Sequence, residues 1–397
     1  MFLLIIINSL AKEIMKNLNY LLLSAMLLCA FAGCRESVVN DGCIEYDLNS
    51  SHQGEIQNVF ADVELIPLDL PDDYYPQGIR ALSITDSIIA IADAGFGLYL
   101  FSADGNFIGC SDDKIGEGPG EFVISMGTSL NPYDSTVEIL TPDRMNKYDL
   151  QLNPVSSTVV PTKIGRDGLM FEYIYDLSDS LHILMPTAVS RDPYRIFMFN
   201  SKSGELTEVQ SYKDDIQYEF TMQGSCWGRD DDGSLLFMPP CYTEYVYKMD
   251  ETTGKINKYI HLIPANSFIT KNEIESLGNT LEQQAAARWT LGKEMPGLTY
   301  VSNNRIFQLT TSQPTIRAMK YYVVSRDSGE VETFPMFKKD KQAFPLINNV
   351  DNNYAYSVME KFRIDDASPE LLLNESHSEQ LDAIDPESLI LLKCRIK

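Results

Sequence analysis

The sequence predicts an all-β fold, a six-bladed β-propeller, on three observations. A short unit recurs six times, tight-turn residues separate alternating strands within the units, and helical periodicity is scarce. Each unit is a small antiparallel sheet that cannot shield both of its faces alone, so the units are expected to pack in a ring. Hydrophobic residues make up 44% of the 397 residues, with 21 Tyr and 18 Phe, which is ample for such a core.

Each unit opens with a polar turn followed by an alternating strand, as in Asp86–Ala92. The six openings fall at Asp86, Asp134, Asp179, Asp232, Asn303 and Asn352. The steps between them are 48, 45, 53, 71 and 49 residues, and propeller blades of three or four strands typically take about 40–50 residues. One opening therefore corresponds to one blade.

A second turn within most units predicts a β-hairpin. These turns are Asp104-Gly105, Ser203-Gly204, Thr253-Gly254 and Ser328-Gly329, each between alternating runs. Glycine adopts positive φ without steric cost, as such turns require.

The sixth unit contains only Tyr354–Lys361 and a terminal strand, Ser388–Lys397. An orphan strand, Val63–Leu68, precedes the first unit. Pairing of these two ends would close the ring and cover both exposed sheet edges. The sequence thus predicts closure by the N-terminal strand on the C-terminal blade.

Two segments depart from the strand pattern. Residues Lys271–Leu291 carry apolar side chains at helical spacing and account for the 71-residue step. Pro369–Leu381 is expected to form another short helix. Both are interpreted as packing insertions, with a functional lid as the alternative.

The N-terminus predicts a secretory signal over residues 1–33. Met15-Lys16-Asn17 precedes an apolar run that ends at Phe31-Ala-Gly-Cys34, so residues 1–14 are interpreted as an extension ahead of the true start. Small residues before a cysteine resemble the lipobox of bacterial lipoproteins, in which Cys34 would be lipidated. An uncleaved membrane anchor is the alternative, although the run is short for a full span. Residues 34–58 are then a tether and residues 59–397 the propeller.

The formal net charge of −24 argues against nucleic acid and anionic membrane surfaces as ligands. Attachment to a membrane is expected only through the lipid, at the outer membrane, on its periplasmic or cell-surface side. Since one chain supplies all six blades, a monomer is expected.

The segment Gly116–Phe122 (Gly-Glu-Gly-Pro-Gly-Glu-Phe) resembles the Gly-x-Gly-Pro-Gly-Glu-aromatic signature of a lipoprotein family of Bacteroides-type bacteria. The final Leu391–Lys397 is similar to that family's closing strand. The resemblance implies a six-bladed propeller akin to NHL-repeat and TolB-like proteins. It implies no reaction, since the family's activity is largely unassigned.

The same glycine loop is interpreted as structural. A dinucleotide fingerprint needs glycine where Glu121 stands, and a P-loop needs Gly-Lys-Ser/Thr. Gly116, Gly118, Pro119 and Gly120 would fix a tight crossing between blades, and Glu121 would cap backbone N–H groups. Ligand binding by the loop is the alternative.

No recognisable catalytic or metal set is present in the sequence. The four histidines (His52, His182, His261 and His377) are scattered, and no Gly-x-Ser-x-Gly elbow occurs. Asp230–Gly233 lacks the alternation of a calcium loop and is interpreted as a solvated turn. No cofactor is expected; calcium in the channel, as in six-bladed lactonases, is possible in principle but no motif supports it. Cys226 and Cys241 could pair within one blade or be buried thiols.

Trp227 and Arg229 are the candidate ligand-binding residues. An aromatic ring beside a guanidinium at the channel mouth would suit a sugar or a peptide carboxylate. Packing of Trp227 between blades is the alternative. The expected function is a cell-envelope protein that binds a glycan, a peptide or a partner protein, with a channel-centred hydrolase or lactonase as the competing hypothesis.

Overall fold

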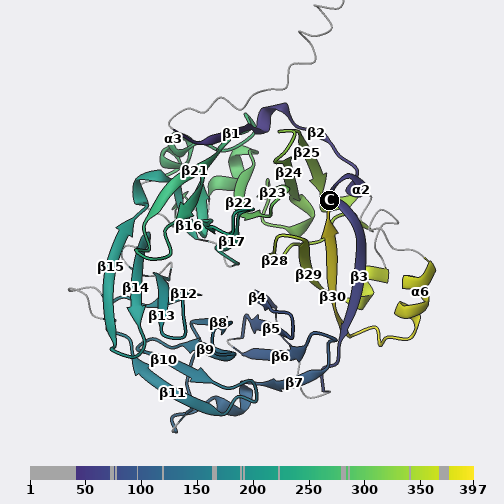
Figure 1. Cartoon of the computed structure of the whole chain (residues 1–397). Coiled ribbons are helices and arrows are strands. Elements are labelled where there is room, and N and C mark those ends of the chain that lie inside the picture. The colour runs from purple at the N-terminus through teal and green to yellow at the C-terminus, as the bar shows by residue number, and fades with distance from the viewer. Residues whose placement is uncertain are drawn as a thin grey trace, which may run out of the picture.

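The structure is a computed structural model that describes residues 42–397, apart from 72–75, 77, 96, 119, 163–167, 188–189, 191–192, 222–223, 279–282, 285–286, 339–340 and 366–374. Six sheets of four or five strands surround a central channel (Figure 1). The predicted six-bladed β-propeller is confirmed.

The first three blades are four-stranded antiparallel sheets, and in each the strands follow chain order outward from the channel. Blade 1 contains β4 (Ile79–Ile84), β5 (Ile88–Asp93), β6 (Leu98–Ser102) and β7 (Phe107–Cys110). Blade 2 contains β8 (Gly127–Asn131), β9 (Thr136–Leu140), β10 (Arg144–Tyr148) and β11 (Pro154–Val159). Blade 3 contains β12 (Phe171–Asp176), β13 (Leu181–Pro186), β14 (Arg195–Asn200) and β15 (Glu205–Ser211).

The other three blades take strands from the N-terminal segment as well. Blade 4 contains β17 (Trp227–Arg229), β18 (Leu235–Phe237), β20 (Tyr245–Met249), β21 (Ile256–Ile263) and the parallel β1 (Ile44–Asp47). Blade 5 contains β22 (Met295–Val301), β23 (Arg305–Thr311), β24 (Met319–Ser325), β25 (Val331–Pro335) and the parallel β2 (His52–Gln53). Blade 6 contains β28 (Asn349–Val350), β29 (Tyr354–Glu360), β30 (Leu389–Ile396) and β3 (Phe60–Leu68).

Small elements decorate the ring. Two small two-stranded sheets pair β16 (Ile216–Thr221) with β19 (Cys241–Thr243) and β26 (Phe337–Lys338) with β27 (Lys341–Gln342). The α-helices with described bounds are α2 (Ile56–Val59), α3 (Lys271–Ser276), α5 (Lys361–Asp365) and α6 (Glu375–Asp382). The 3-10 turns are η1 (Leu48–Ser50), η2 (Asp112–Lys114), η3 (Lys213–Asp215), η4 (Arg288–Leu291) and η5 (Ile316–Ala318). None of the helices among the described residues is long and apolar enough to cross a membrane.

Each of the two predicted helical segments contains a helix, and residues 279–282, 285–286 and 369–374 of these segments lie outside the described residues. In the first segment, α3 begins at a capping box in which Thr270 and Glu273 satisfy each other's backbone N–H groups, and η4 follows after a stretch that includes undescribed residues. In the second segment, α6 covers Glu375–Asp382. Both segments lie at the periphery of the ring (Figure 1).

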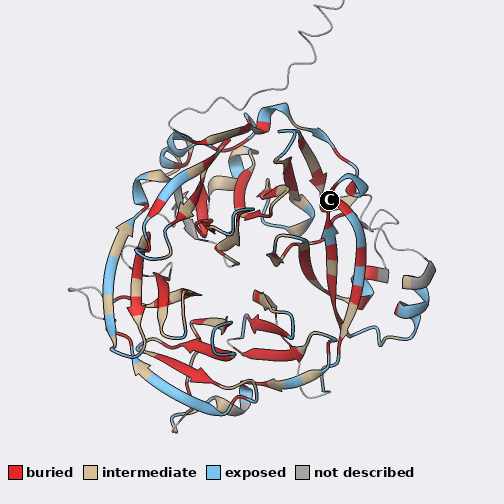
Figure 2. Cartoon of the chain, viewed as in Figure 1, coloured by how far each residue is buried: buried red, intermediate tan, exposed pale blue. Residues whose placement is uncertain are grey.

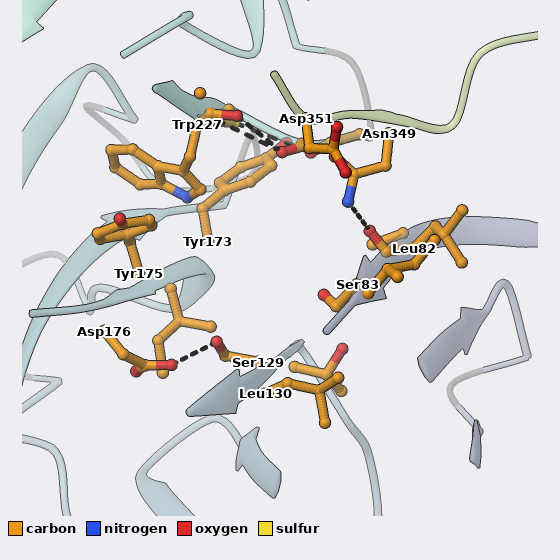
Figure 3. Close-up of a pocket in the computed structure, with 18 of the residues that line it drawn as sticks. Leu82, Ser83, Ser129, Leu130, Tyr173, Tyr175, Asp176, Trp227, Asn349 and Asp351 are labelled. Atoms are coloured by element: carbon orange, nitrogen blue, oxygen red, sulfur yellow. Dashed lines mark hydrogen bonds between the residues drawn. The ribbon is translucent and has the colours of Figure 1, made fainter. Parts of the chain in front are cut away.

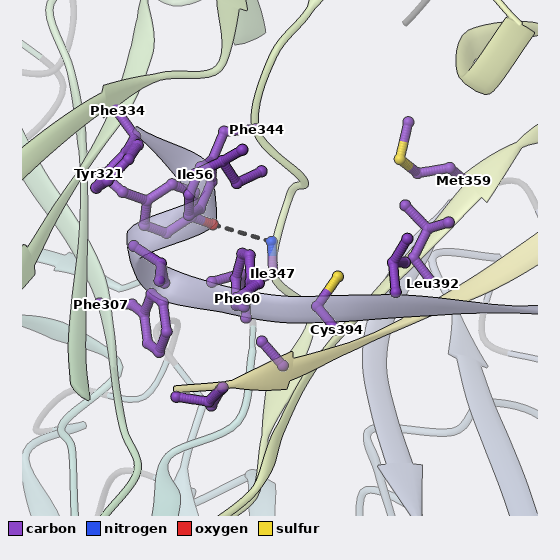
Figure 4. Close-up of a cluster of buried hydrophobic side chains, with 14 of the residues drawn as sticks. Ile56, Phe60, Phe307, Tyr321, Phe334, Phe344, Ile347, Met359, Leu392 and Cys394 are labelled. Carbon is purple, nitrogen blue, oxygen red and sulfur yellow. Dashed lines mark hydrogen bonds between the residues drawn. The ribbon is translucent and has the colours of Figure 1, made fainter. Parts of the chain in front are cut away.

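The N-terminal strand closes the ring as predicted. β3 pairs antiparallel with β30, with Val63 opposite Cys394 and Leu65 opposite Leu392. Phe60, at the start of β3, also reaches blade 5, where its ring lies 6.1 Å from Phe307, and it lies 5.6 Å from Phe344 in the segment that connects blade 5 to blade 6 (Figure 4). The same strand thus completes blade 6 and packs that blade against blade 5.

Residues 44–53, assigned from the sequence to the tether, also pair with the ring. Ile44 is opposite Ile260 and His52 is opposite Glu332, in parallel registers at the outer edges of blades 4 and 5. The described N-terminal segment therefore covers two sheet edges that would otherwise be exposed.

The core consists of six hydrophobic clusters among the described residues, one at each junction between neighbouring blades. The second strands are the most buried, since every residue of β5, β9 and β18 is buried, whereas the outer β11 and β15 are largely exposed (Figure 2). Burial between blades therefore holds the ring together, as expected for units that cannot stand alone.

The predicted starting point of each blade requires one correction. The turns at Asp86, Asp134, Asp179, Asp232, Asn303 and Asn352 join the first strand of each blade to the second, so they do not open the blades. Each blade begins with a strand that precedes its polar turn. These overlooked strands line the channel.

Candidate ligand-binding channel

The channel contains a cavity of about 520 Å³. Its wall comes from the first strands of five blades, β4, β8, β12, β17 and β28, together with the turns that follow them (Figure 3). This volume lies within the roughly 300–1,000 Å³ range of small-molecule sites. Ring closure creates the cavity, because no single blade supplies more than one part of the wall.

Three aromatic side chains gather on one side of the cavity. Tyr173 and Tyr175 come from β12 of blade 3, and Trp227 comes from β17 of blade 4 (Figure 3). The Trp227 ring lies 5.0 Å from the Tyr175 ring and 5.3 Å from the buried Phe237 ring. Trp227 therefore packs between two blades, which is the alternative interpretation, and it also lines the cavity, where a ligand-binding residue would have to lie.

Arg229 is held against the same aromatic side. Its guanidinium donates to the Tyr175 hydroxyl at 2.7 Å, to the Gly233 carbonyl at 2.7 Å and to the Glu251 carboxylate at 2.5 Å. Burial raises the pKa of Tyr175 to about 12, so its hydroxyl stays protonated near neutral pH. Arg229 thus fixes the tyrosine and has its own charge balanced by Glu251.

A second arginine anchors the wall between blades 1 and 2. The buried Arg80 of β4 donates to the backbone carbonyls of Ser125 and Met126, both at 3.0 Å. Glu172 of β12 also lines the cavity, and burial raises the pKa of its carboxyl while the nearby Arg80 opposes that rise. The carboxyl is therefore displaced toward its neutral form.

Polar groups occupy other parts of the wall. Asn349 of β28 donates to the Leu82 carbonyl at 2.8 Å, which ties blade 6 to blade 1. The Asp351 carboxylate accepts from the Tyr356 hydroxyl at 2.6 Å and from two backbone N–H groups. Ser129 donates to Asp176 at 2.6 Å. In Figure 3, Ser83, Asn349 and Asp351 lie across the cavity from Tyr175.

The glycine loop lies between β7 and β8, at the crossing from blade 1 to blade 2. The Gly118 N–H donates to the Glu121 carboxylate at 2.7 Å, and the Gly120 carbonyl accepts from the Tyr148 hydroxyl at 3.2 Å. Gly116, Gly118, Gly120 and Glu121 are not among the cavity-lining residues. Pro119 and the predicted lipidation site Cys34 lie outside the described residues.

Two further sequence interpretations are settled by the geometry. Cys226 and Cys241 are free thiols, both buried, and burial raises both pKa values well above the usual range. Asp231–Gly233 form an exposed turn as interpreted, but the carboxylate of Asp230 is buried, pairs with Arg326 at 2.8 Å and accepts from Tyr259 at 2.6 Å. These contacts join blade 4 to blade 5.

Sequence reasoning missed most of the cavity wall, including Tyr173, Tyr175, Ser129, Asn349 and Asp351. One signal could have found part of it. Each polar turn is a hairpin turn, so a strand must precede it as well as follow it. Phe171–Asp176, with Tyr at positions 173 and 175, alternates in that place.

The fold is similar to that of two solved proteins from Bacteroides. A crystal structure named "Putative exported protein" from Bacteroides fragilis is 12% identical, with a TM-score of 0.66, and the alignment covers 89% of this chain and 99% of that one. A DUF4221 family member from Bacteroides vulgatus is 11% identical, with a TM-score of 0.50, over 85% of this chain and 99% of that one. At such identities the likeness shows the fold alone.

No curated protein sequence matches the chain. The model of one family, described as a domain of unknown function (DUF4934), matches residues 44–388. That match spans β1 to the residue before β30 and so contains nearly the whole ring. The chain therefore belongs to the DUF4934 family.

Proposed function

We propose that the protein is a cell-envelope binding protein whose channel takes an uncharged oligosaccharide. The observation that carries the proposal is the 520 Å³ cavity, with Tyr173, Tyr175 and Trp227 on one side and hydroxyl, amide and carboxylate groups around it. Aromatic rings offer an apolar platform for the face of a sugar ring, and polar groups nearby fix the orientation of its hydroxyls.

The charges of the wall support a neutral ligand. Arg229 is paired with Glu251, Arg80 is bonded to backbone carbonyls, and Asp351 is surrounded by donors. A charged ligand would have to displace these partners, and leaving a buried charge unpaired is costly. Hydroxyls remain available: Ser83 and Thr128 line the cavity, and their hydroxyls make no hydrogen bond to another described residue.

The competing hydrolase hypothesis finds no support in the wall. Within the described ranges, the one group of His, Cys, Asp and Glu side chains that could hold a metal is Glu138, Asp176 and His182. Glu138 and His182 are fully buried and only Asp176 of the three lines the cavity, so two of the three members are out of reach of a ligand there. An aromatic wall whose arginines already have partners suits binding.

The test is isothermal titration calorimetry with soluble oligosaccharides of several linkages, including cello-, xylo-, malto- and chito-oligosaccharides. We expect at least one series to bind and Trp227→Ala to weaken it at least tenfold, about 1.4 kcal/mol. Trp289→Ala is the matched control, because Trp289 lies on η4 and does not line the cavity. Binding that is equal in both variants would refute the channel site, and no binding in any series would refute the sugar.

The proposed envelope location is supported by the N-terminal sequence and by the one structural neighbour named as a putative exported protein. We propose lipidation of Cys34 and attachment to the outer membrane, since acyl chains add roughly 0.8 kcal/mol per buried methylene. Labelled palmitate should be incorporated by the full chain and lost in Cys34→Ala. Equal incorporation in the two chains would contradict the anchor.

A further inference from the structure

One buried polar cluster is not explained by ring packing or by the proposed sugar site. It lies between blades 2 and 3 and contains Glu138 of β9, Asp176 at the end of β12 and His182 of β13. The first and last have no exposed surface, and Asp176 is 4% exposed. One ligand atom from each lies within 4.8 Å of the other two.

The outer atoms of all three side chains are occupied. Glu138 Oε1 accepts from the Asn131 amide at 3.0 Å and from Lys147 Nζ at 2.8 Å. Asp176 Oδ2 accepts from the Ser129 hydroxyl at 2.6 Å. These partners fix the orientation of both carboxylates.

The imidazole is oriented in the same manner. His182 Nε2 lies 3.1 Å from Ser201 Oγ, and the Ser201 hydroxyl donates its own proton to the Ser180 carbonyl at 3.3 Å. With that hydroxyl donating to Ser180, Ser201 Oγ accepts from Nε2–H, and in this neutral tautomer Nδ1 carries a lone pair. In the other tautomer Nδ1–H donates to Asp176 Oδ1 at 2.8 Å.

The inner atoms of the three side chains converge. His182 Nδ1 lies 2.8 Å from Asp176 Oδ1 and 3.2 Å from Glu138 Oε2, and Glu138 Oε2 makes no hydrogen bond to a described residue. In the Nε2–H tautomer with both carboxylates ionised, three lone pairs face one another in a dry interior and repel, unless a cation sits among them. A histidine that binds a metal through one ring nitrogen usually donates a hydrogen bond from the other, which fixes the orientation of its ring.

The charge of the cluster is also incomplete. With neutral His182, the carboxylates of Glu138, Asp176 and Asp134 and the ammonium of Lys147 sum to −2, where Lys147 lies 2.8 Å from both Asp134 and Glu138. A divalent cation would neutralise the cluster.

We propose that Glu138, Asp176 and His182 bind a divalent transition-metal ion, Zn²⁺ by preference, which joins blade 2 to blade 3. The donor set of two carboxylate oxygens and one imidazole nitrogen is one that Zn²⁺ takes in proteins. Ligands of a tetrahedral zinc ion at about 2.0–2.1 Å stand roughly 3.4 Å apart, so a small outward movement of the three atoms makes room. Asp176 lines the channel cavity, which gives the ion an entry path.

The first test uses the wild-type full chain. Metal content is measured by plasma mass spectrometry after desalting, and the EDTA-treated protein is then titrated with Zn²⁺ and with Co²⁺. We expect one equivalent, a dissociation constant of about 1 µM or tighter, and visible d–d bands from Co²⁺ with a nitrogen ligand. Absence of uptake of both ions by the folded, EDTA-treated protein would overturn the proposal.

The second test uses variants that distinguish a site from adventitious binding. His182→Gln and Glu138→Gln should abolish the Co²⁺ bands and weaken Zn²⁺ binding at least a hundredfold. His261→Gln is the matched control, because His261 also contacts two carboxylates, Glu45 and Glu244, but through opposite nitrogens that cannot converge on one ion. Unchanged Zn²⁺ affinity in the His182 variant, or equal loss in the control, would contradict the assignment. None of these readouts depends on sugar binding.

Discussion

Replacing Phe60 by alanine should destabilise the protein through the closing strand. Phe60 is 1% exposed and packs against Phe307 of the neighbouring blade and against Phe344 in the connection between the two blades. Truncating a buried phenylalanine to alanine typically costs about 3–5 kcal/mol, the lost transfer free energy plus the cavity left behind. Because Phe60 also loses its contacts with two aromatic rings, we expect a cost in the upper part of that range.

The expected change in melting temperature follows from the size of the ring. An unfolding entropy of about 2.1 cal/mol/K per residue over roughly 340 residues makes 1 kcal/mol equivalent to about 1.4 °C. Phe60→Ala should therefore lower Tm by about 4–7 °C in differential scanning calorimetry.

The control is Phe362→Ala, which removes the same side chain from a position that is 51% exposed. Its effect should stay within about 0.5 kcal/mol, less than 1 °C. If Phe60→Ala lowers Tm no more than Phe362→Ala does, β3 does not pack between blades 5 and 6 as described.

Two further changes probe other junctions. Gly127→Ala places a Cβ 2.0 Å from the Glu172 carbonyl oxygen of the next blade and should destabilise the protein by about 1–3 kcal/mol. Gly168→Ala is the control, because a Cβ on Gly168 meets nothing within 4 Å. Equal Tm values for the two alanine variants in calorimetry would contradict the close approach of blades 2 and 3 at Gly127. Hydrogen bonds with Glu244 and then Glu45 raise the pKa of His261 above 6.5, so its stabilising contribution is complete below pH 6.5 and is lost as pH rises through the raised folded-state pKa. Urea unfolding across that window should show this loss in the wild type and not in His261→Gln, and identical pH profiles would count against it.

The ring could be predicted because its strongest signals are local. Turns such as Asp104-Gly105 mark hairpins within a few residues, and Gly105 does adopt a φ of 86°. The closing strand was also predictable, because Val63–Leu68 lacked a partner at one end of the chain and Ser388–Lys397 lacked one at the other.

The channel wall was harder to predict because its strands are short and partly polar. β17 has three residues and β28 has two, too few for alternation to stand out. The docking of β1 and β2 was missed for the same reason, as β2 has two exposed residues.

The buried cluster illustrates a second limit. His182 looked isolated in the sequence, since its partner Glu138 lies 44 residues away and belongs to another blade. Ligand motifs are recognisable when their members share one helix or loop, whereas the spacing here is set by how blades stack. Only the assembled ring brings these side chains together.

The most direct measurement of the central claim, closure of the ring by the N-terminal strand, is a cross-link in the β3–β30 register. Val63 and the free thiol Cys394 are direct cross-strand partners, and both are buried in the same cluster. Directly opposed residues in antiparallel strands lie about 4.5–5.5 Å apart, within reach of a disulfide. Under mild oxidation, the Val63→Cys variant should therefore form a disulfide with Cys394, detected as a linked peptide in a digest analysed without reductant. The Glu64→Cys variant, in which residue 64 is opposite Lys393, should not form this link. No link from position 63, or an equal link from position 64, would contradict the closed ring.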